Sequence, residues 1–372
     1  MTVRLRGLTW DHERGRNSIV AASRAYTDAG HNVEVEWEAR SLQAFADQDL
    51  ESLTQSYDLL VIDHPHIPHA ADAGLLAPLP DGEGSDAFVG RSDESYRWQD
   101  ARYAFAIDAA AQVAAYRPDL LPEPPRTWPE VLDLAHAGAV LWPAKPIDAF
   151  ASVFTLASGL QDADAGRMGF AEPTAFAQAW DLLSRLRDLV PAECLDENPI
   201  QTADRLSSSN RWAYAPLLYG YSNYARTGFR EHRLRWADIP DIAGQPRGSM
   251  LGGAGLAVSA RTTHGAEAVA FAAWVATSEV QRGVYAQAGG QPGHVSAWTD
   301  AALDELTGGF FAGTRRTLDL ASLRPQHPEY MAVQDAACEL VHRGLLNHAP
   351  APEVLADLDL LFAPLGAVHA RR

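Results

Sequence analysis

The stretch from Met250 to His294 constrains the fold of this chain more than any other part of the sequence. A glycine-rich turn, 250–255, leads into a short apolar strand, and an alanine-rich segment that predicts consecutive helices over 265–288 follows. A Gly-Gly-x-Pro break over 289–292 ends the unit. Glycine permits backbone geometry and close approach that other residues forbid. We therefore expect Gly252 and Gly253 to form a tight hinge turn, and their backbone N–H groups can also donate to ligand oxygens.

The first hundred residues alternate between strand and helix patterns. The continuous apolar run 59–62 predicts a parallel strand that is buried on both faces, and the alternation over 33–37 predicts a half-buried strand at an edge. This order predicts a doubly wound α/β lobe. The remaining elements expected here are a strand over 3–10, a helix over 17–29 that ends at Gly30, and a polar helix over 41–54.

Polar residues follow two of these strands. Ligands bind beyond the carboxyl ends of strands in such sheets, so the side chains at strand ends are the candidate site residues. They are Trp10, His12, Asp63, His64 and His66. Three explanations stay open for the Asp and His residues: hydrogen bonds to ligand hydroxyls, structural capping, or metal binding and acid–base catalysis.

The second half of the chain predicts another lobe. A strand over 103–107 leads out of the first lobe, and 109–115 begins the second. Thr127-Trp-Pro-Glu130 is a capping box and is structural. Further strands are expected over 139–142 and from 211 into an aromatic loop that ends at Tyr221. Helices are expected from Pro146 to about Leu160, over 174–189 and from about 328, where the chain packs on the second lobe.

Aromatic residues at the ends of these strands suit a sugar ring. Flat π surfaces cover the apolar face of a pyranose, and a few polar groups then fix its orientation. The ordinary alternative is that Trp and Tyr belong to the core. The candidates are Trp10, Trp142, Tyr219 and Tyr221. Arg211 and Arg226 are the basic residues expected near the aromatic loop, where an arginine that faces the cleft would suit an anionic ligand.

Composition bounds the function. A chain of 372 residues predicts two lobes, and the net charge of −18 argues against nucleic acid or an anionic membrane as partner. The two cysteines, Cys194 and Cys338, lack metal spacing and are expected to be buried free thiols. The sequence shows no P-loop, dinucleotide fingerprint, nucleophile elbow or zinc helix, so we predict no cofactor, no metal and no catalytic residue.

Three further segments accompany the glycine-rich unit. They are Tyr57-Asp-Leu-Leu-Val-Ile-Asp63, Ala73-Gly-Leu-Leu-Ala-Pro-Leu79, and Tyr116-Arg-Pro-Asp-Leu-Leu121 with Pro125-Arg-Thr-Trp-Pro-Glu-Val-Leu132. In this order they resemble the extracellular solute-binding proteins of ABC importers, the sugar-type family 1 group. The resemblance runs from about residue 1 to about residue 300. It implies a two-lobed α/β fold, the type II periplasmic-binding-protein fold, with lobe I in 1–108 plus 250–304 and lobe II in 109–249 plus 305–372.

The resemblance also implies a function and a site. A small polar ligand, either a carbohydrate or a sugar acid or organic acid, would be captured between the lobes and passed to an ABC permease by a monomeric receptor. Cleft residues implied by the resemblance are Asp108 at the crossover, Asp148, Gly252, Gly253 and Gln291. The segment Met1–Trp10 has no apolar leader pattern and no lipid-anchored cysteine, although the family is extracytoplasmic. A cytoplasmic enzyme or ligand sensor that uses the Asp/His cluster is therefore the alternative.

Overall fold

The first lobe is built on a twisted sheet. The computed structural model describes residues 2–40, 50–161 and 169–366. Strand β1 pairs in parallel with β2 on one side and β3 on the other, whereas β9 joins β3 in antiparallel fashion. The bounds are β1 Val3–Trp10, β2 Val33–Arg40, β3 Leu59–Ile62, β6 Ala104–Tyr116 and β9 Leu251–Val258, in the order β2-β1-β3-β9-β6. The doubly wound start predicted from the alternation is confirmed, with β2 at the edge.

Both faces of this sheet are covered. In β3, Leu59 and Val61 belong to one core and Leu60 and Ile62 to another, because successive side chains of a strand point to opposite faces. Residues of α1 and α10 complete the first core, and those of α3 and α4 the second. The bounds are α1 Glu13–Asp28, α3 Leu50–Ser56, α4 Ile67–Asp72 and α10 Gly265–Val275.

One strand runs through both lobes. β6 is 13 residues long and buried along its whole length. Its first half pairs with β9, and its second half pairs with β7 Tyr214–Tyr219 and β8 Arg235–Ala237. The register of the β6–β9 pair shifts between Ala106 and Asp108, opposite Gly255 and Ala254. The sequence predicted two separate segments here, but the chain crosses between the lobes without leaving the sheet.

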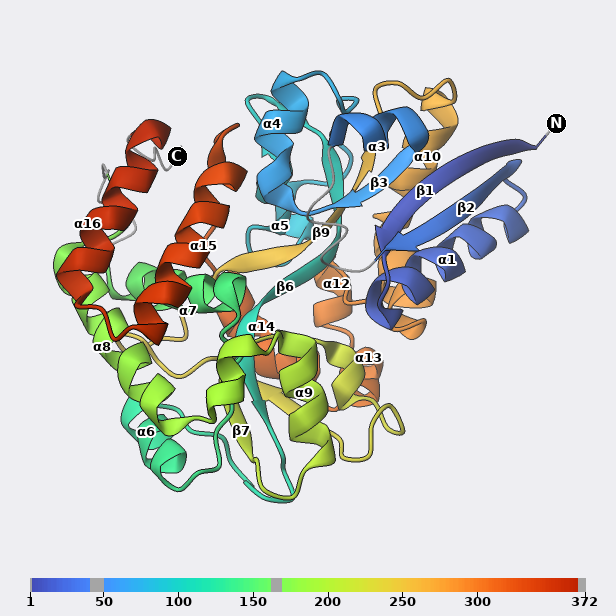
Figure 1. Cartoon of the computed structure of the whole chain (residues 1–372). Helices are drawn as coiled ribbons and strands as arrows, with labels where there is room; N and C mark the ends of the chain where they lie inside the picture. The colour runs from blue at the N-terminus through green and yellow to red at the C-terminus, as the bar shows by residue number, and fades with distance from the viewer. Residues whose placement is uncertain (1, 41–49, 162–168, 367–372) are drawn as a thin grey trace.

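The second lobe surrounds the far half of β6 with helices. α15 packs on α7, and α16 packs on both α8 and α15 (Figure 1). The helix bounds are α6 Trp128–His136, α7 Pro146–Leu160, α8 Pro173–Leu189, α9 Pro199–Ser208, α14 Phe310–Asp319, α15 Tyr330–Leu346 and α16 Ala351–Phe362. The helical C-terminal part is confirmed, as is the capping box before α6.

Short elements connect the lobes and fill their edges. They are η1 His64–His66, η2 Ser85–Ala87, α5 Ser92–Ser95, β4 Arg97–Trp98, β5 Ala101–Arg102, η3 Ala192–Asp196, η4 Ser222–Ala225, α11 Ser278–Val280, η5 Gln281–Tyr285, α12 Val295–Trp298, α13 Ala301–Leu306 and η6 Ala363–Leu365. The Trp298 ring packs on Phe311 of α14 with centroids 5.1 Å apart, so the end of the 250–304 segment contacts the core of the second lobe. The lobe boundaries at 108, 249 and 304 stay a prediction.

Several expected elements differ. Helix α1 starts at Glu13 rather than at 17, because His12 caps it. The expected strand 139–142 is wrong: only Val140 forms a bridge, to Tyr214. The expected helices over 265–288 break after Val275 and again at the non-helical Gly283. The expected helix over 41–54 begins at Leu50 within the described residues, and 41–49 lie outside them.

Two properties of the described ranges bear on the expected class of protein. Cys194 and Cys338 are buried free thiols, as predicted. No helix in residues 2–40, 50–161 and 169–366 has the length and apolarity that crossing a bilayer requires.

Candidate functional site

The two strand-end clusters begin helices. The His12 ring accepts a hydrogen bond from the backbone N–H of Arg14 through Nδ1, at 3.1 Å, and caps α1. Asp63 accepts from the N–H of His64 at 2.8 Å and caps η1. Side-chain caps of this kind satisfy N–H groups that a helix start leaves unpaired. Structural capping, one of the three explanations left open, is therefore what both side chains do in this structure.

A buried ion pair joins the first cluster to both lobes. Arg14 donates to both carboxylate oxygens of Asp108, with Nε 2.8 Å from Oδ2, and its Nη1 donates to the Gly220 carbonyl at 2.8 Å. Its guanidinium also lies over the Tyr221 ring, 4.8 Å from the centroid. Arg14 thus connects the start of α1, the middle of β6 and the end of β7.

A second buried arginine meets the other cluster. Arg324 Nη2 lies 2.6 Å and 2.7 Å from the two carboxylate oxygens of Asp63. Its Nε lies 3.3 Å from His64 Nε2, which is itself 3.2 Å from the Leu251 carbonyl. Both contacts come from the same nitrogen, and hydrogen bonds between oppositely charged groups are stronger than those between neutral groups. The Asp63 side chain nevertheless keeps 38% of its surface exposed, whereas that of Arg324 keeps 4%.

Arg324 comes from a segment that crosses between the lobes. This C-terminal strap, 321–329, connects α14 to α15. The Ser322 carbonyl accepts from Leu251 N at 2.9 Å. The Gln326 side chain donates to the Arg97 carbonyl at 3.0 Å, next to α5 of the first lobe. The sequence predicted that the C-terminal part packs largely on the second lobe, and the strap is an exception to that expectation.

The Tyr219 ring packs against Gly252, and Gly253 lies next to Asp108. Gly252 leaves room for the Tyr219 ring, since a Cβ there would lie 2.9 Å from the ring. Gly253 has φ +116°, and a Cβ would lie 2.3 Å from the Asp108 carbonyl oxygen. The Tyr219 hydroxyl donates to the Met250 carbonyl at 3.3 Å. All three residues stay partly exposed. Both glycines lie within β9, opposite Ala110 and Ala109 of β6, so the tight turn expected at these positions is wrong, and the glycines instead allow the close approach of Tyr219 and Asp108.

The tryptophans lie in the cores. Trp142 is fully buried, and its indole N–H donates to Ser152 at 3.0 Å. Trp10 is 6% exposed and packs against Gly15, where a Cβ would lie 2.4 Å from the ring. Both placements are those of ordinary core residues. Ligand contact by either ring stays a prediction.

Gln291 and Asp148 are both buried. Gln291 donates to the Ala109 carbonyl at 2.8 Å and accepts from Ser222 N at 3.0 Å, so its amide already bridges two segments. Asp148 Oδ2 and the Tyr330 hydroxyl are buried and have no hydrogen-bond partner among the described residues. Buried polar atoms without partners are costly and uncommon. Ligand contact by Asp148 or Gln291 stays a prediction.

Electrostatics show that the two clusters share one region. Burial raises the pKa of Tyr96, and the carboxylates of both Asp63 and Asp108 add to the shift. Burial also raises the pKa of Tyr219, and Asp63 and Asp148 act on it in the same direction. Burial raises the pKa of Asp148 well above its usual range, with only Lys145 opposing.

The imidazoles in this region resist protonation. Burial and the neighbouring Arg14 lower the pKa of His12 to about 4. Burial lowers the pKa of His66, and the nearby Arg324 adds to the shift while Asp63 opposes it. The His12 ring contacts Tyr221 edge-on, with centroids 4.8 Å apart. In residues 2–40, 50–161 and 169–366, His, Cys, Asp and Glu side chains form no group of three that would hold a metal ion.

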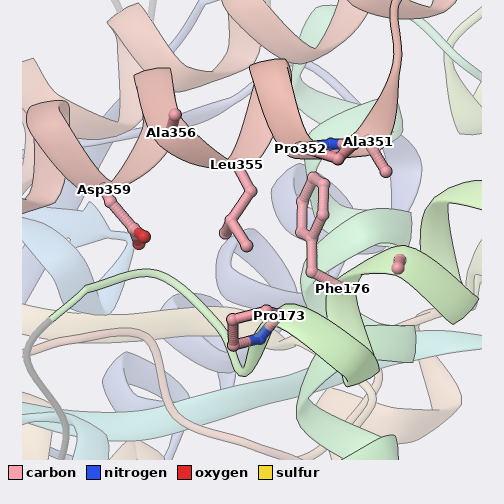
Figure 2. A pocket seen from close by; sticks show the side chains of 8 residues that line it. Pro173, Phe176, Ala351, Pro352, Leu355, Ala356 and Asp359 are labelled. Atoms are coloured by element: carbon pink, nitrogen blue, oxygen red, sulfur yellow. The ribbon is translucent and has the colours of Figure 1, made fainter.

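The pocket in Figure 2 lies elsewhere. It is a shallow, mostly apolar groove between α8 and α16, in the second lobe. Pro173 and Phe176 face Pro352 and Leu355 across it. A second groove lies beside Trp128 on α6. Neither contains a residue predicted for the site, and the shared interlobe cleft stays a prediction.

Sequence reasoning missed the two arginines. Arg211 and Arg226 were the basic residues expected near the aromatic loop. Arg211 lies over Trp212, and Arg226 donates to backbone carbonyls, including that of Gln287. Arg14 follows the His12 cluster by two positions and carries a detectable signal, because a helix start at a strand end places its first turn at the site. Nothing in the sequence around Arg324 distinguishes it from a surface arginine.

The chain is similar to known proteins in its sequence family and in its fold. A family model described as bacterial extracellular solute-binding protein matches residues 21–305. No curated protein matches the chain in sequence. The structure of maltose-bound T. maritima MalE3 is similar with a TM-score of 0.83 and 16% identity, covering 98% of this chain and 100% of that one.

Two further solved structures are ABC transporter solute-binding proteins. The one from Agrobacterium radiobacter K84 in complex with ribitol has a TM-score of 0.76 and 17% identity, covering 98% of each chain. The one from Thermotoga lettingae TMO bound with α-D-tagatose has a TM-score of 0.80 and 16% identity, covering 98% of this chain and 100% of that one. At these identities the likeness shows the fold, and it confirms the two-lobed α/β class predicted from the sequence.

Proposed function

Because the chain belongs to the bacterial extracellular solute-binding proteins, we propose that it captures a small hydroxyl-rich solute between its lobes. It hands this solute to an ABC permease, as a monomer whose lobes divide near residues 108, 249 and 304. The family and the solved neighbours are binding proteins, and we propose that this chain likewise binds its ligand without converting it. The similar structures hold maltose, ribitol and tagatose, which have many hydroxyl groups and no charge.

The pairing of charges supports a neutral ligand over an acid. Arg14 is bound by Asp108 and Arg324 by Asp63, so neither guanidinium offers an uncompensated positive charge to a carboxylate. Asp63, partly exposed, is instead an acceptor for a hydroxyl donor, and the partly exposed Tyr219 ring suits an apolar sugar face. Among the ligand classes expected from the sequence, carbohydrates therefore fit better than sugar acids or organic acids, and polyols such as ribitol share the neutral, hydroxyl-rich chemistry of carbohydrates.

Calorimetric titration with maltose, ribitol, D-tagatose and D-gluconate tests this proposal. We expect saturable binding of at least one neutral compound, and weaker binding of gluconate. Asp63→Asn keeps the shape of the side chain but removes its charge, and loss of a charge-assisted hydrogen bond weakens binding about tenfold or more. Addition of EDTA should leave the affinity unchanged. Preferential binding of gluconate, or formation of a product detected by NMR after long incubation, would overturn the proposal.

A further inference from the structure

The Asp63 carboxylate is held on one side and open on the other. Its Oδ1 accepts from Arg324 Nη2 at 2.6 Å and from His64 N at 2.8 Å, whereas Oδ2, among the described residues, accepts from Arg324 alone, at 2.7 Å. A carboxylate has about four lone-pair sites, so Oδ2 keeps acceptor capacity. The exposed 38% of the side chain gives a ligand access to it. The position of this carboxylate is thus fixed, and its Oδ2 can still accept a hydrogen bond.

Arg324 is itself fixed on three sides. Besides Asp63, its Nε lies 3.3 Å from His64 Nε2 and its Nη1 lies 3.4 Å from Gln334 Oε1 of α15. The strap that carries it is anchored at Ser322, whose N–H donates to the Ser249 carbonyl at 2.8 Å, and at Gln326. The guanidinium therefore has little freedom, and neither has the carboxylate that it grips.

We propose that Arg324 is a positioning residue for the ligand: from the C-terminal strap it orients the Asp63 carboxylate and keeps it charged as a hydroxyl acceptor. This inference rests on the proposed function, because it takes Asp63 to contact the solute. It assigns a role in solute selection to a segment beyond residues 21–305, where the family model ends. Arg324 is buried, whereas the Asp63 side chain keeps part of its surface exposed, so the carboxylate that Arg324 holds stays accessible.

The electrostatic surroundings make the role measurable. Burial alone would raise the pKa of Asp63, but the charge of Arg324 and its hydrogen bonds to the carboxylate outweigh this, and the net shift is downward. Replacing Arg324 by glutamine removes the positive charge that offsets the effect of burial, so the pKa of Asp63 should rise. The groups that interact electrostatically with Asp63 are His64 and His66 of η1, Tyr96 after α5, Tyr219 at the end of β7, Arg324 of the strap and Tyr330 of α15.

The experiment compares Arg324→Gln, Arg324→Lys and the wild type, with affinities measured between pH 4.5 and 7.5 and the carboxyl titration followed down to about pH 2.5, because the pKa of Asp63 lies below its ordinary value. Affinities for maltose, ribitol and D-tagatose are measured by calorimetry. The titration of the Asp63 carboxyl carbon is followed by NMR in protein labelled with ¹³C-aspartate, with Asp63→Asn as the assignment standard. Arg315→Gln is the matched control, because it breaks an exposed arginine–aspartate pair on α14.

For Arg324→Gln we expect an upward shift of the Asp63 titration and an affinity that falls steadily toward pH 4.5. The lysine variant keeps the positive charge but loses the planar guanidinium group. Its Asp63 titration should therefore stay close to that of the wild type, while its affinity drops about tenfold or less. Arg315→Gln should match the wild type in both measurements. Circular dichroism shows whether each variant is folded. If the glutamine variant does not fold, the lysine variant still tests the inference.

Two results would overturn the inference. One is an unchanged Asp63 titration in Arg324→Gln, and the other is a loss of affinity of equal size at every pH. If none of the three probes binds the wild type, the proposed ligand class fails. The carboxyl titration, which needs no ligand, then still decides whether Arg324 controls Asp63.

Discussion

His64 is a neutral imidazole in the folded protein. Burial and the neighbouring Arg324 lower its pKa to about 3, and Asp63 only partly opposes this. In the unfolded chain the ring titrates near its ordinary pKa of about 6.5. The folded state therefore binds fewer protons than the unfolded state between these two values. The stability that a neutral His64 allows is present above about pH 6.5 and is lost as the pH falls toward 3.

Replacing this ring should flatten the acid side of the stability curve. His64→Gln removes the titrating group and keeps an amide near the Leu251 carbonyl. Between pH 7 and pH 5 the wild type should lose about 2 kcal/mol more unfolding free energy than the variant, which is the linkage contribution of one such histidine. Urea unfolding at several pH values measures the difference. His69→Gln, on the exposed end of α4, is the control, and equal slopes for all three proteins would contradict the assignment.

The sequence identified individual candidate site residues better than it identified the residues with which they pair. The rule that sites gather at strand ends singled out His12 and Asp63, and both lie near the interlobe region. Arg14 pairs with Asp108, and Arg324 pairs with Asp63. In each pair a long stretch of chain separates the two residues. No local pattern encodes such pairings, because they depend on how the lobes and the strap are placed in three dimensions.

The β6–β9 ribbon is the element that connects the lobes. Its register shift lies at Ala106–Asp108, and Gly253 opposite Ala109 has a positive φ. The sequence singled out Gly253 because glycine adopts such a conformation without strain, but the turn expected there is part of strand β9. The continuity of β6 was not predictable, since its alanine-rich sequence has no alternation of polar and apolar residues. For the same reason the isolated Val140 bridge was mistaken for a strand.

Gly253→Ala should damage this ribbon. The added Cβ would meet the Asp108 carbonyl oxygen at 2.3 Å, and alanine disfavours φ +116°. Together these effects should lower the unfolding free energy by about 2 kcal/mol or more. Gly228→Ala is the matched control, since Gly228 also has a positive φ, +80°, but nothing within 4 Å of its Cβ position. Equal losses in the two variants, measured by thermal unfolding, would show that backbone strain alone matters.

Two ion pairs join segments that lie far apart in the sequence, and in the Arg14–Asp108 pair both side chains are buried. Arg14 reaches the Gly220 carbonyl at the end of β7, and Arg324 brings the strap to Asp63. Solute receptors of this kind open and close about hinges, and a ligand shifts that equilibrium only by its differential affinity for the two states. Contacts that already join the lobes therefore set the starting point of the equilibrium.

Removing the first pair should open the ligand-free protein. Arg14→Met alone leaves Asp108 buried without its partner and should cost about 3–5 kcal/mol of unfolding free energy. The double variant Arg14→Met/Asp108→Leu replaces the pair by apolar groups and should recover most of that loss. Its radius of gyration in small-angle scattering should exceed that of the wild type. An unchanged radius would mean that this pair does not hold the lobes together.

The position of β9 in the first lobe has a consequence for synthesis of the chain. Leu59 of β3 pairs with Val258 of β9, and the residues between them include most of the second lobe. While the ribosome is still making residues 109–249, β3 and the first half of β6 have no β9 between them. Unpaired strand edges of this kind invite association with other chains. The nascent protein thus passes through a stage at which a chaperone that shields exposed strands would be needed most.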